Sequence, residues 1–300
     1  MSPVTPKQSM TEPLNESPKE QQENTGMADF LKALKKSSEL KWIMGDWYLG
    51  DFSIENEVVD ELLPRIQHAI QEDPGLVEQL VTVTFHDDGW YESMPFLGYL
   101  PNLEQIVLYG NTLLSDLSIL AEHPNLRRVA FTNYCCIEPK KGGLDWLNTL
   151  PKLEELVFFE GYLELDGWIP APQTLAKLRS LWMNWRDAQV LPRKALPNLE
   201  QLTLYILDFD DFLQKLEDSS QENKGETAEN DNLFPFVLFA ADAKRQKLRL
   251  VFEKQESKEL QEKIEQTFKQ RLTKETHIEM YWKKQAMPLL NDGYGFIQKD

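Results

Sequence analysis

The sequence has little cysteine and no long hydrophobic run. Its only two cysteines, Cys135 and Cys136, are neighbours among 300 residues. Adjacent Cα atoms lie about 3.8 Å apart, too close for an unstrained disulfide between the two. A chain without a disulfide framework fits a reducing compartment, so we expect a cytoplasmic protein. No stretch approaches the roughly 18–20 consecutive apolar residues that a membrane-spanning helix needs, and the first residues contain no apolar run typical of a secretory signal.

Positive charge is also in short supply. The chain carries 32 Lys and Arg against 49 Asp and Glu, a net charge of −17. Binding to nucleic acid or to an anionic membrane draws its affinity from clustered Lys and Arg, so neither is expected as a partner. The acidity permits a protein partner with a basic surface, attracted by electrostatic steering. The alternative is that the charge only keeps the protein soluble.

Residues that usually make catalytic or metal sites are few. None of the four histidines has a second His or Cys at ligand spacing, so no zinc site is expected. The tightest cluster, His86 with Asp87 and Asp88, is interpreted as a solvated strand end because no nucleophile is implied nearby. Gly293-Tyr294-Gly295 is too short for a phosphate-binding loop. We expect a protein with no enzymatic activity, no cofactor and no metal.

What the chain does have is a repeated phrase. Leu-Pro-Asn-Leu-Glu-Gln occurs at the start of Leu100–Tyr109 and again at the start of Leu196–Tyr205. Looser copies lie at His123–Thr132, Leu150–Phe159 and Leu175–Asn184, and a weaker one begins at Leu80. The shared core is L-x-x-(L/I/V)-x-(L/M/F), and its first leucines are spaced by 21 to 27 residues. A fixed core recurring at this interval predicts a stacked solenoid.

The phrase is similar to the leucine-rich-repeat signature L-x-x-L-x-L-x-x-N. Leu103–Asn111 matches it throughout if Ile106 stands in for Leu, whereas the other copies lack the asparagine. The chain therefore resembles a divergent bacterial-type leucine-rich repeat protein with short repeats. The resemblance implies an α/β solenoid with a curved parallel sheet on its concave face, short helices or irregular segments on its convex face, and an N-terminal helical cap. It covers Leu80–Leu207, and Leu40–Trp282 if terminal copies are included.

Composition suggests five parts. We expect a disordered polar tail, an N-terminal cap, leucine-rich repeats, a mobile acidic loop and C-terminal repeats or a cap, over residues 1–26, 27–79, 80–207, 208–232 and 233–300. The loop is predicted because nine carboxylates against two lysines lie between Asp208 and Asp231. A separate small α/β domain at the end of the chain is the alternative.

Local patterns predict individual elements. Helices are expected over residues 27–36, 55–71 and 257–272, and helical turns over 113–123 and 144–150. Strands are expected over residues 40–48, with a Gly-Asp turn inside, 247–253 and 277–282. Residues 161–174 are expected to be irregular, and 234–241 form an apolar run.

Strand alternation predicts which side chains would face a partner. Positions four and six of the phrase point inward, and positions three, five and seven form outward columns. These columns are Thr82, Gln105, Arg128, Glu155, Ser180 and Gln201; Thr84, Val107, Ala130, Val157, Trp182 and Thr203; His86, Tyr109, Thr132, Phe159, Asn184 and Tyr205. Exposed aromatic and aliphatic groups on such a sheet are typical of a binding hot spot.

The predicted partner-binding residues follow from these columns: Tyr109, Val107, Val157, Phe159, Trp182, Tyr205, Glu155 and His86. Glu155, with Glu160 and Asp187, would supply an acidic edge. The alternative is that the acidic loop, the N-terminal tail or a second copy of the chain covers this surface.

The sequence thus favours a protein–protein interaction module that binds through its concave face, for example an inhibitor or immunity-like protein for a basic partner. Two alternatives stay open. One is a targeting subunit or an enzyme with its activity in residues 233–300, and the other is a self-associating structural protein.

Overall fold

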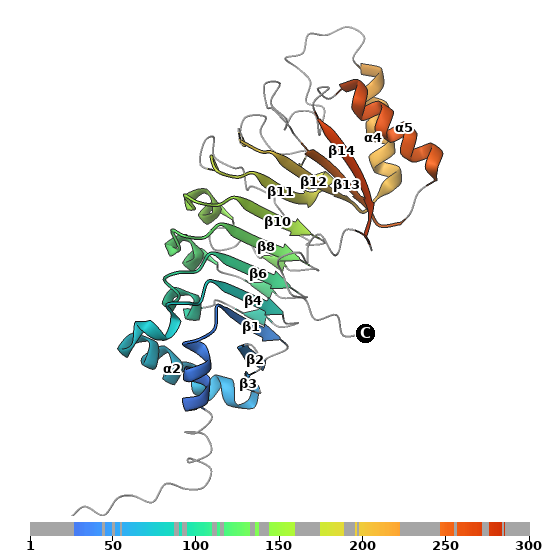
Figure 1. Cartoon of the computed structure of the whole chain (residues 1–300). Helices are drawn as coiled ribbons and strands as arrows, with labels where there is room; N and C mark the ends of the chain where they lie inside the picture. The colour runs from blue at the N-terminus through green and yellow to red at the C-terminus, as the bar shows by residue number, and fades with distance from the viewer. Residues whose placement is uncertain are drawn as a thin grey trace, which may run out of the picture.

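The chain folds into a mixed α/β structure around one large, mostly parallel open sheet (Figure 1). The structure is a computed structural model. It describes residues 27–43, 46–49, 52–54, 56–86, 90–91, 95–109, 113–114, 117–132, 136–137, 144–159, 175–188, 196, 198–222, 247–254, 257–271, 276–283 and 285. The predicted tail over residues 1–26, the segment 161–174 and the apolar run 234–241 lie outside the described residues.

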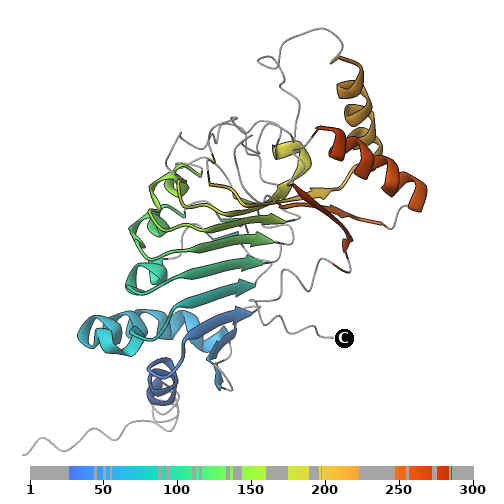
Figure 2. The same cartoon turned by 45° about the horizontal axis from the view of Figure 1, so that its top comes forward.

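The large sheet has 11 strands in the order β14-β13-β12-β11-β10-β8-β6-β4-β1-β2-β3. The parallel strands are β1 (Glu39–Ile43), β4 (Thr82–His86), β6 (Gln105–Tyr109), β8 (Arg128–Thr132), β10 (Glu155–Phe159), β11 (Ser180–Asn184), β12 (Gln201–Ile206), β13 (Lys247–Phe252) and β14 (His277–Trp282). Two antiparallel strands, β2 (Asp46–Leu49) and β3 (Phe52–Ile54), complete the end beyond β1. The parallel strands point their C-terminal ends to the same edge of the sheet (Figure 2).

The return path from one long strand to the next is also repetitive. Three short strands, β5 (Trp90–Tyr91), β7 (Leu113–Leu114) and β9 (Cys136–Ile137), form a small parallel sheet. They are followed by the 3₁₀ turns η2 (Pro95–Tyr99), η3 (Ser118–Glu122) and η5 (Asp145–Thr149). The predicted helical turn over residues 144–150 is confirmed. The predicted helical turn over residues 113–123 begins as strand β7, because its first residues pair with β5 and β9 of the neighbouring repeats.

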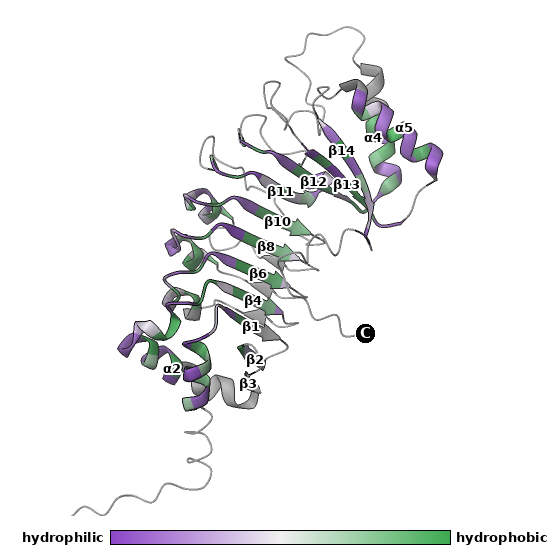
Figure 3. Cartoon of the chain, viewed as in Figure 1, coloured by the Kyte–Doolittle hydropathy of each residue, from purple (hydrophilic) through white to green (hydrophobic). Residues whose placement is uncertain are grey.

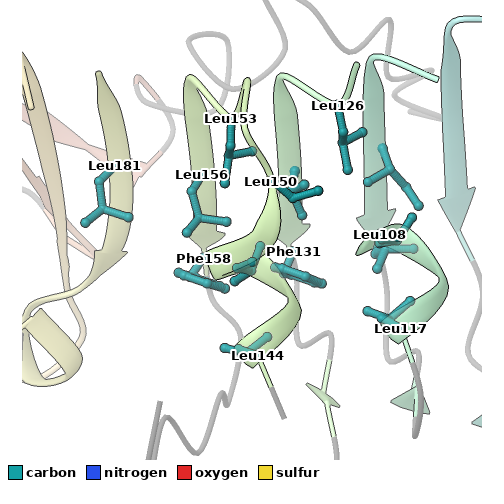
Figure 4. Packing of buried hydrophobic residues seen from close by; sticks show 14 of the residues in the cluster. Leu108, Leu117, Leu126, Phe131, Leu144, Leu150, Leu153, Leu156, Phe158 and Leu181 are labelled. Carbon is teal, nitrogen blue, oxygen red and sulfur yellow. The ribbon is translucent and has the colours of Figure 1, made fainter. Parts of the chain in front are cut away.

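The register of the long strands matches the aligned phrases. Val107 pairs with Ala130, Ala130 with Val157, and Val157 with Trp182, and these residues share the middle column of the sequence prediction. Residues at positions four and six of the phrase are buried in the main core, with the helical turns packed against them. In Figure 4, Phe131 and Phe158 lie side by side above Leu144, with ring centroids 5.3 Å apart and planes 5° from parallel.

Successive repeats are also joined by hydrogen bonds from the asparagine of the Pro-Asn-Leu phrase. The Asn102 side chain donates to the Glu78 carbonyl at 2.9 Å, and Asn198 donates in the same way to the Ala176 carbonyl. Lys152, which replaces asparagine in its copy, donates to Asn125 Oδ1 at 2.6 Å. The two asparagines bind backbone carbonyls of the preceding repeat, and Lys152 binds the side chain of Asn125, so the phrase links neighbouring repeats through its third residue.

The N-terminal part packs on the core as two helical segments. Residues 27–34 are helical and bury Phe30 and Leu34, as predicted. The second segment is α2 (Asn56–Glu72), which buries Ile66 and Ile70. It stops before η1 (Pro74–Val77), where the Asp73 side chain accepts a hydrogen bond from the Gly75 N–H at 3.1 Å.

At the other end, the predicted strands β13 and β14 and the predicted helix α5 (Lys258–Arg271) are all present. Both strands continue the large sheet in the same register. Helices α4 (Phe209–Glu222) and α5 lie together beside this end of the sheet (Figure 1).

The prediction of a mobile loop over residues 208–232 is wrong for its first half. Residues Phe209–Glu222 form helix α4, preceded by Asp208, whose Oδ1 accepts from the Asp211 N–H at 3.0 Å. Phe212 and Leu216 are buried because they share one face of this helix, and the Phe212 ring lies 6.3 Å from that of Phe268. The acidic residues begin the helix, where negative charge is favourable, rather than preventing it. Among the described residues, no helix is long and apolar enough to cross a membrane.

Candidate interaction surface

The candidate site is the face of the large sheet formed by the three outward columns, called here the outward face. Every described helix that buries residues contributes them to the main core on the opposite face. The structure extends the columns to strands that the sequence prediction left out: Glu39 and Lys41 from β1; Lys247, Arg249 and Val251 from β13; His277, Glu279 and Tyr281 from β14. The six residues from β13 and β14 could have been assigned to the outward columns from the sequence. Their segments, KLRLVF and HIEMYW, alternate in the same way as the phrase of the repeats.

The apolar part of the outward face is buried, which corrects the prediction that it faces water. Val107, Val157, Phe159, Trp182 and Tyr205 are at most 3% exposed, and they form a second hydrophobic cluster with Ala130 and Val251. The Phe159 ring lies 4.7 Å from the ring of Tyr205 and 6.3 Å from that of Trp182.

The strand sequences explain this burial. Strands such as Glu155-Leu-Val-Phe-Phe carry apolar residues at consecutive positions, the pattern of a strand buried on both faces. In Figure 3, β8 and β10 begin hydrophilic and become hydrophobic toward their C-terminal ends. The outward side chains therefore change from polar at the start of each strand to apolar at its end. Strand alternation predicts which face a side chain lies on but not this change along the strand.

Three of the predicted site residues remain partly accessible: His86, Tyr109 and Glu155. His86 and Tyr109 are register partners on β4 and β6, and their rings meet edge to face with centroids 4.3 Å apart. Aromatic pairs of this geometry contribute about 0.5–1.5 kcal/mol beyond the area that they bury, so the two rings hold each other in place.

The first outward column is a row of partly buried polar side chains across consecutive strands. Its members from β1 to β13 are Glu39, Thr82, Gln105, Arg128, Glu155, Ser180, Gln201 and Lys247. Arg128 Nε lies 3.0 Å from Glu155 Oε2. Burial raises the pKa of Glu155, and the positive charges of Arg128 and Arg249 oppose that rise.

A denser polar network ends the outward face at β13 and β14. Glu279 accepts from Lys247 at 2.6 Å, from Arg249 at 2.9 Å and from the Tyr281 hydroxyl at 2.9 Å. Burial of the carboxylate works against ionisation, but these donors outweigh it and lower the pKa of Glu279 to about 2. Burial and the neighbouring carboxylate raise the pKa of Tyr281. The network is a set of mutually satisfied charges.

The outward face displays little of the chain's negative charge. Its charged members in the described strands are Lys41, Arg128, Lys247 and Arg249 against Glu39, Glu155 and Glu279. Of the other acidic residues predicted for its edge, Glu160 lies outside the described residues and Asp187 belongs to α3 (Trp185–Ala188) after the strand. The outward face is therefore formed by ion pairs, hydrogen bonds and ring packing rather than by unpaired carboxylates.

The remaining histidines do not gather into a site. His123 is buried beneath the η turns, burial lowers its pKa, and its Nε2 has no hydrogen-bond partner among the described residues. His68 is exposed on α2, 3.3 Å from Glu72, and His277 lies 3.5 Å from Glu279. Within the part of the chain that the structure describes, no three His, Cys, Asp or Glu side chains are grouped to hold a metal ion.

Comparison of the sequence with protein-family models and with curated proteins finds no match. The fold and the geometry of the outward face are therefore the basis for a functional assignment.

Proposed function

We propose that the chain is a leucine-rich-repeat solenoid with an N-terminal cap, and that it works as a non-enzymatic protein-interaction module. The class is supported by one short phrase per strand, an in-register parallel sheet, and a return path of short strand and 3₁₀ turn. Repeat folds of this kind stack units that contact only their neighbours, and they usually act by offering one continuous face to a partner.

The proposal is supported by two features of the outward face: the row of half-buried polar side chains at the start of the strands, and the His86–Tyr109 pair at the ends of β4 and β6. The His86 and Tyr109 rings belong to register partners on adjacent strands of one sheet, and they pack edge to face. Side chains already held by their neighbours lose little conformational freedom on binding, so each contact contributes more to affinity. A partly exposed tyrosine within a polar rim is typical of an interface anchor.

A partner with a basic surface fits the net charge of −17. In this proposal the acidic excess acts at long range and speeds the encounter, whereas the outward face supplies the contacts. An inhibitor or immunity-like protein for a basic enzyme is one form of it. Raising the salt concentration should then slow association while changing dissociation little.

The test compares Tyr109→Ala with Tyr99→Ala, which makes the same truncation in η2, packed against the main core. A partner is first identified by affinity purification with the full chain and then produced separately. Tyr109→Ala should weaken its binding by about 2 kcal/mol, roughly 30-fold, while the variant stays folded, because loss of the His86 ring contact lowers its stability by only about 0.5–1.5 kcal/mol beyond the lost buried area. Tyr99→Ala should bind as the natural chain does. Equal affinity of the natural chain and Tyr109→Ala would contradict the proposed surface.

Self-association is the second candidate, and strand β14 favours it. β14 ends the described sheet, and its residues are partly or fully exposed, whereas most residues of its neighbour β13 are buried. Uncovered edge strands can pair with a second chain. Light scattering at increasing protein concentration tests this, and a constant monomer mass would exclude it.

A further inference from the structure

Charged side chains at the beginnings of the long strands follow a regular order across the sheet. Positions two and three of the phrase bring charge of one sign to each strand from β6 to β12, and the sign reverses at every step. The outward charges of β13 and β14 continue the reversal. We call these residues the alternating ladder. With His277 counted as neutral, its members in strand order are Glu104; Arg127 and Arg128; Glu154 and Glu155; Arg179; Glu200; Lys247 and Arg249; Glu279.

Backbone hydrogen bonds place the ladder residues of successive strands side by side. The Arg127 N–H donates to the Glu104 carbonyl at 2.8 Å, and the Glu154 N–H donates to the Arg127 carbonyl at 2.8 Å. The same bond recurs from Arg179 to Glu154 and from Glu200 to Arg179. Each strand from β8 to β13 therefore has oppositely charged neighbours on both sides. Ion pairs join Arg128 to Glu155 at 3.0 Å, Arg179 to Glu200 at 3.9 Å and Lys247 to Glu279 at 2.6 Å.

The apolar core does not determine the order in which these repeats stack. Position one is a buried leucine in every repeat from β6 to β12, and position four is a buried isoleucine, valine or leucine. Cores this similar hold one repeat against another about equally well, because hydrophobic burial is not directional. The information that selects neighbours must come from residues that differ between repeats, and the ladder residues differ in sign.

The alternation opposes one particular error of assembly. Strands two apart in the sheet carry the same sign, as Arg127 and Arg179 do. A sheet that skipped one repeat would bring such like charges to neighbouring strands, about 4.8 Å apart. Misassembly of similar units is a characteristic failure of repeat proteins. An exposed pair such as Arg179 and Glu200, with side chains 65% and 61% exposed, adds little to stability, but each wrong pairing replaces attraction by repulsion.

We propose that the alternating ladder selects the neighbour of each strand while the sheet assembles. Opposite charges favour the next repeat along the chain, and like charges disfavour the repeat after it, both within one molecule and between molecules. The ladder is a stacking device built into the fold. It does not depend on the proposed binding function, so each can fail without the other.

The first experiment exchanges two charges without changing the composition. The double variant Glu154→Arg with Arg179→Glu keeps the net charge at −17, because one acid becomes a base and one base becomes an acid. It gives positions 127 and 154 the same sign, and likewise positions 179 and 200. Each protein is unfolded in urea and refolded by dilution at low salt, and native monomer is measured by size exclusion and circular dichroism. The double variant should yield at least twofold less native monomer than the natural chain, and equal yields would overturn the proposal.

Two further substitutions should rescue the double variant. Adding Arg127→Glu and Glu200→Arg again leaves the net charge unchanged and restores opposite signs at position two between β8 and β10, β10 and β11, and β11 and β12. This fourfold variant should yield at least twofold more native monomer than the double variant. The control Glu154→Asp with Arg179→Lys keeps both signs and should refold as the natural chain does. A fourfold variant that refolds no better than the double variant would refute the proposal, including the case in which the double variant does not fold.

Salt gives an independent readout of the same effect. At about 1 M salt the Debye length falls to about 3 Å, shorter than the spacing of about 4.8 Å between strands. The natural chain and the double variant should then refold with equal yields. A difference that persists at high salt would assign the loss to side-chain packing rather than to charge, and it would contradict selection by the ladder.

Discussion

Replacing Glu279 by glutamine should remove most of the stabilisation of the polar network that joins β13 and β14. The carboxylate is 19% exposed and accepts from Lys247, Arg249 and Tyr281. Its pKa falls from the usual 4.5 to about 2 in the folded chain. Each pKa unit corresponds to about 1.4 kcal/mol, so the charged form stabilises the fold by about 3 kcal/mol at pH 7.

The sign of this effect gives a second test. Because the pKa of Glu279 is lowered on folding, the stabilisation is fully present above pH 4.5 and is lost as the pH falls toward 2. We expect the difference in unfolding free energy between the natural chain and Glu279→Gln to fall from about 3 kcal/mol at pH 7 to about 1.4 kcal/mol at pH 3. Urea unfolding followed by circular dichroism measures both values.

The matched control for Glu279 is Glu262→Gln in helix α5. Glu262 lies 3.8 Å from Lys258, and its side chain is 60% exposed. Exposed pairs of this kind contribute at most about 1 kcal/mol, so this variant should be nearly as stable as the natural chain at every pH. If Glu279→Gln cost as little as the control and showed no pH dependence, the reasoning about the network would be refuted.

Two further predictions concern the core. Phe212→Ala should destabilise the chain by about 3–5 kcal/mol, because Phe212 is buried between Phe252 and Phe268; a melting temperature equal to that of the natural chain would show that α4 is not packed. Burial lowers the pKa of His123 below 6.5 in the folded chain. As the pH falls, His123 is therefore protonated at a higher pH in the unfolded chain than in the folded chain, so acid favours unfolding. From pH 7 to pH 5 the unfolding free energy of the natural chain should therefore fall more steeply than that of His123→Asn. Parallel pH curves for the two proteins would contradict a contribution of His123 to acid unfolding.

The repeated phrase was enough to predict the main core and the strand register. Alternation within β6 puts Ile106 and Leu108 on one face, Leu103 is buried in the same core from the turn before the strand, and stacking of similar phrases fixes which residues become neighbours. Local spacing also identified α2, α5 and the last two strands. These features depend on residues close together in the sequence, where periodicity is a direct signal.

The acidic composition of residues 208–232 led to the prediction of a loop where the chain forms helix α4. Its carboxylates suggested a mobile loop, but Phe209, Phe212, Leu213 and Leu216 recur at helical spacing within the same segment. All four are buried or packed against the main core. The spacing of these few apolar residues should have taken precedence over the charge of the residues between them, because burial of one helical face outweighs weak surface electrostatics.

The burial of the outward face could not be derived from strand alternation. Consecutive apolar residues in β10 indicate burial on both faces, yet no local pattern identifies what covers the outward face. As a result, Tyr109, His86 and Glu155 keep their predicted accessibility, whereas Trp182 and its neighbours do not.

The most direct test of the interaction role is a hydroxyl-radical footprint of the chain with and without its purified partner. We expect oxidation of His86 and Tyr109 to fall several-fold in the complex, while Tyr99, packed against the main core, reacts as in the free chain. Protection centred on Tyr99 with Tyr109 unchanged would contradict a partner seated on the outward face.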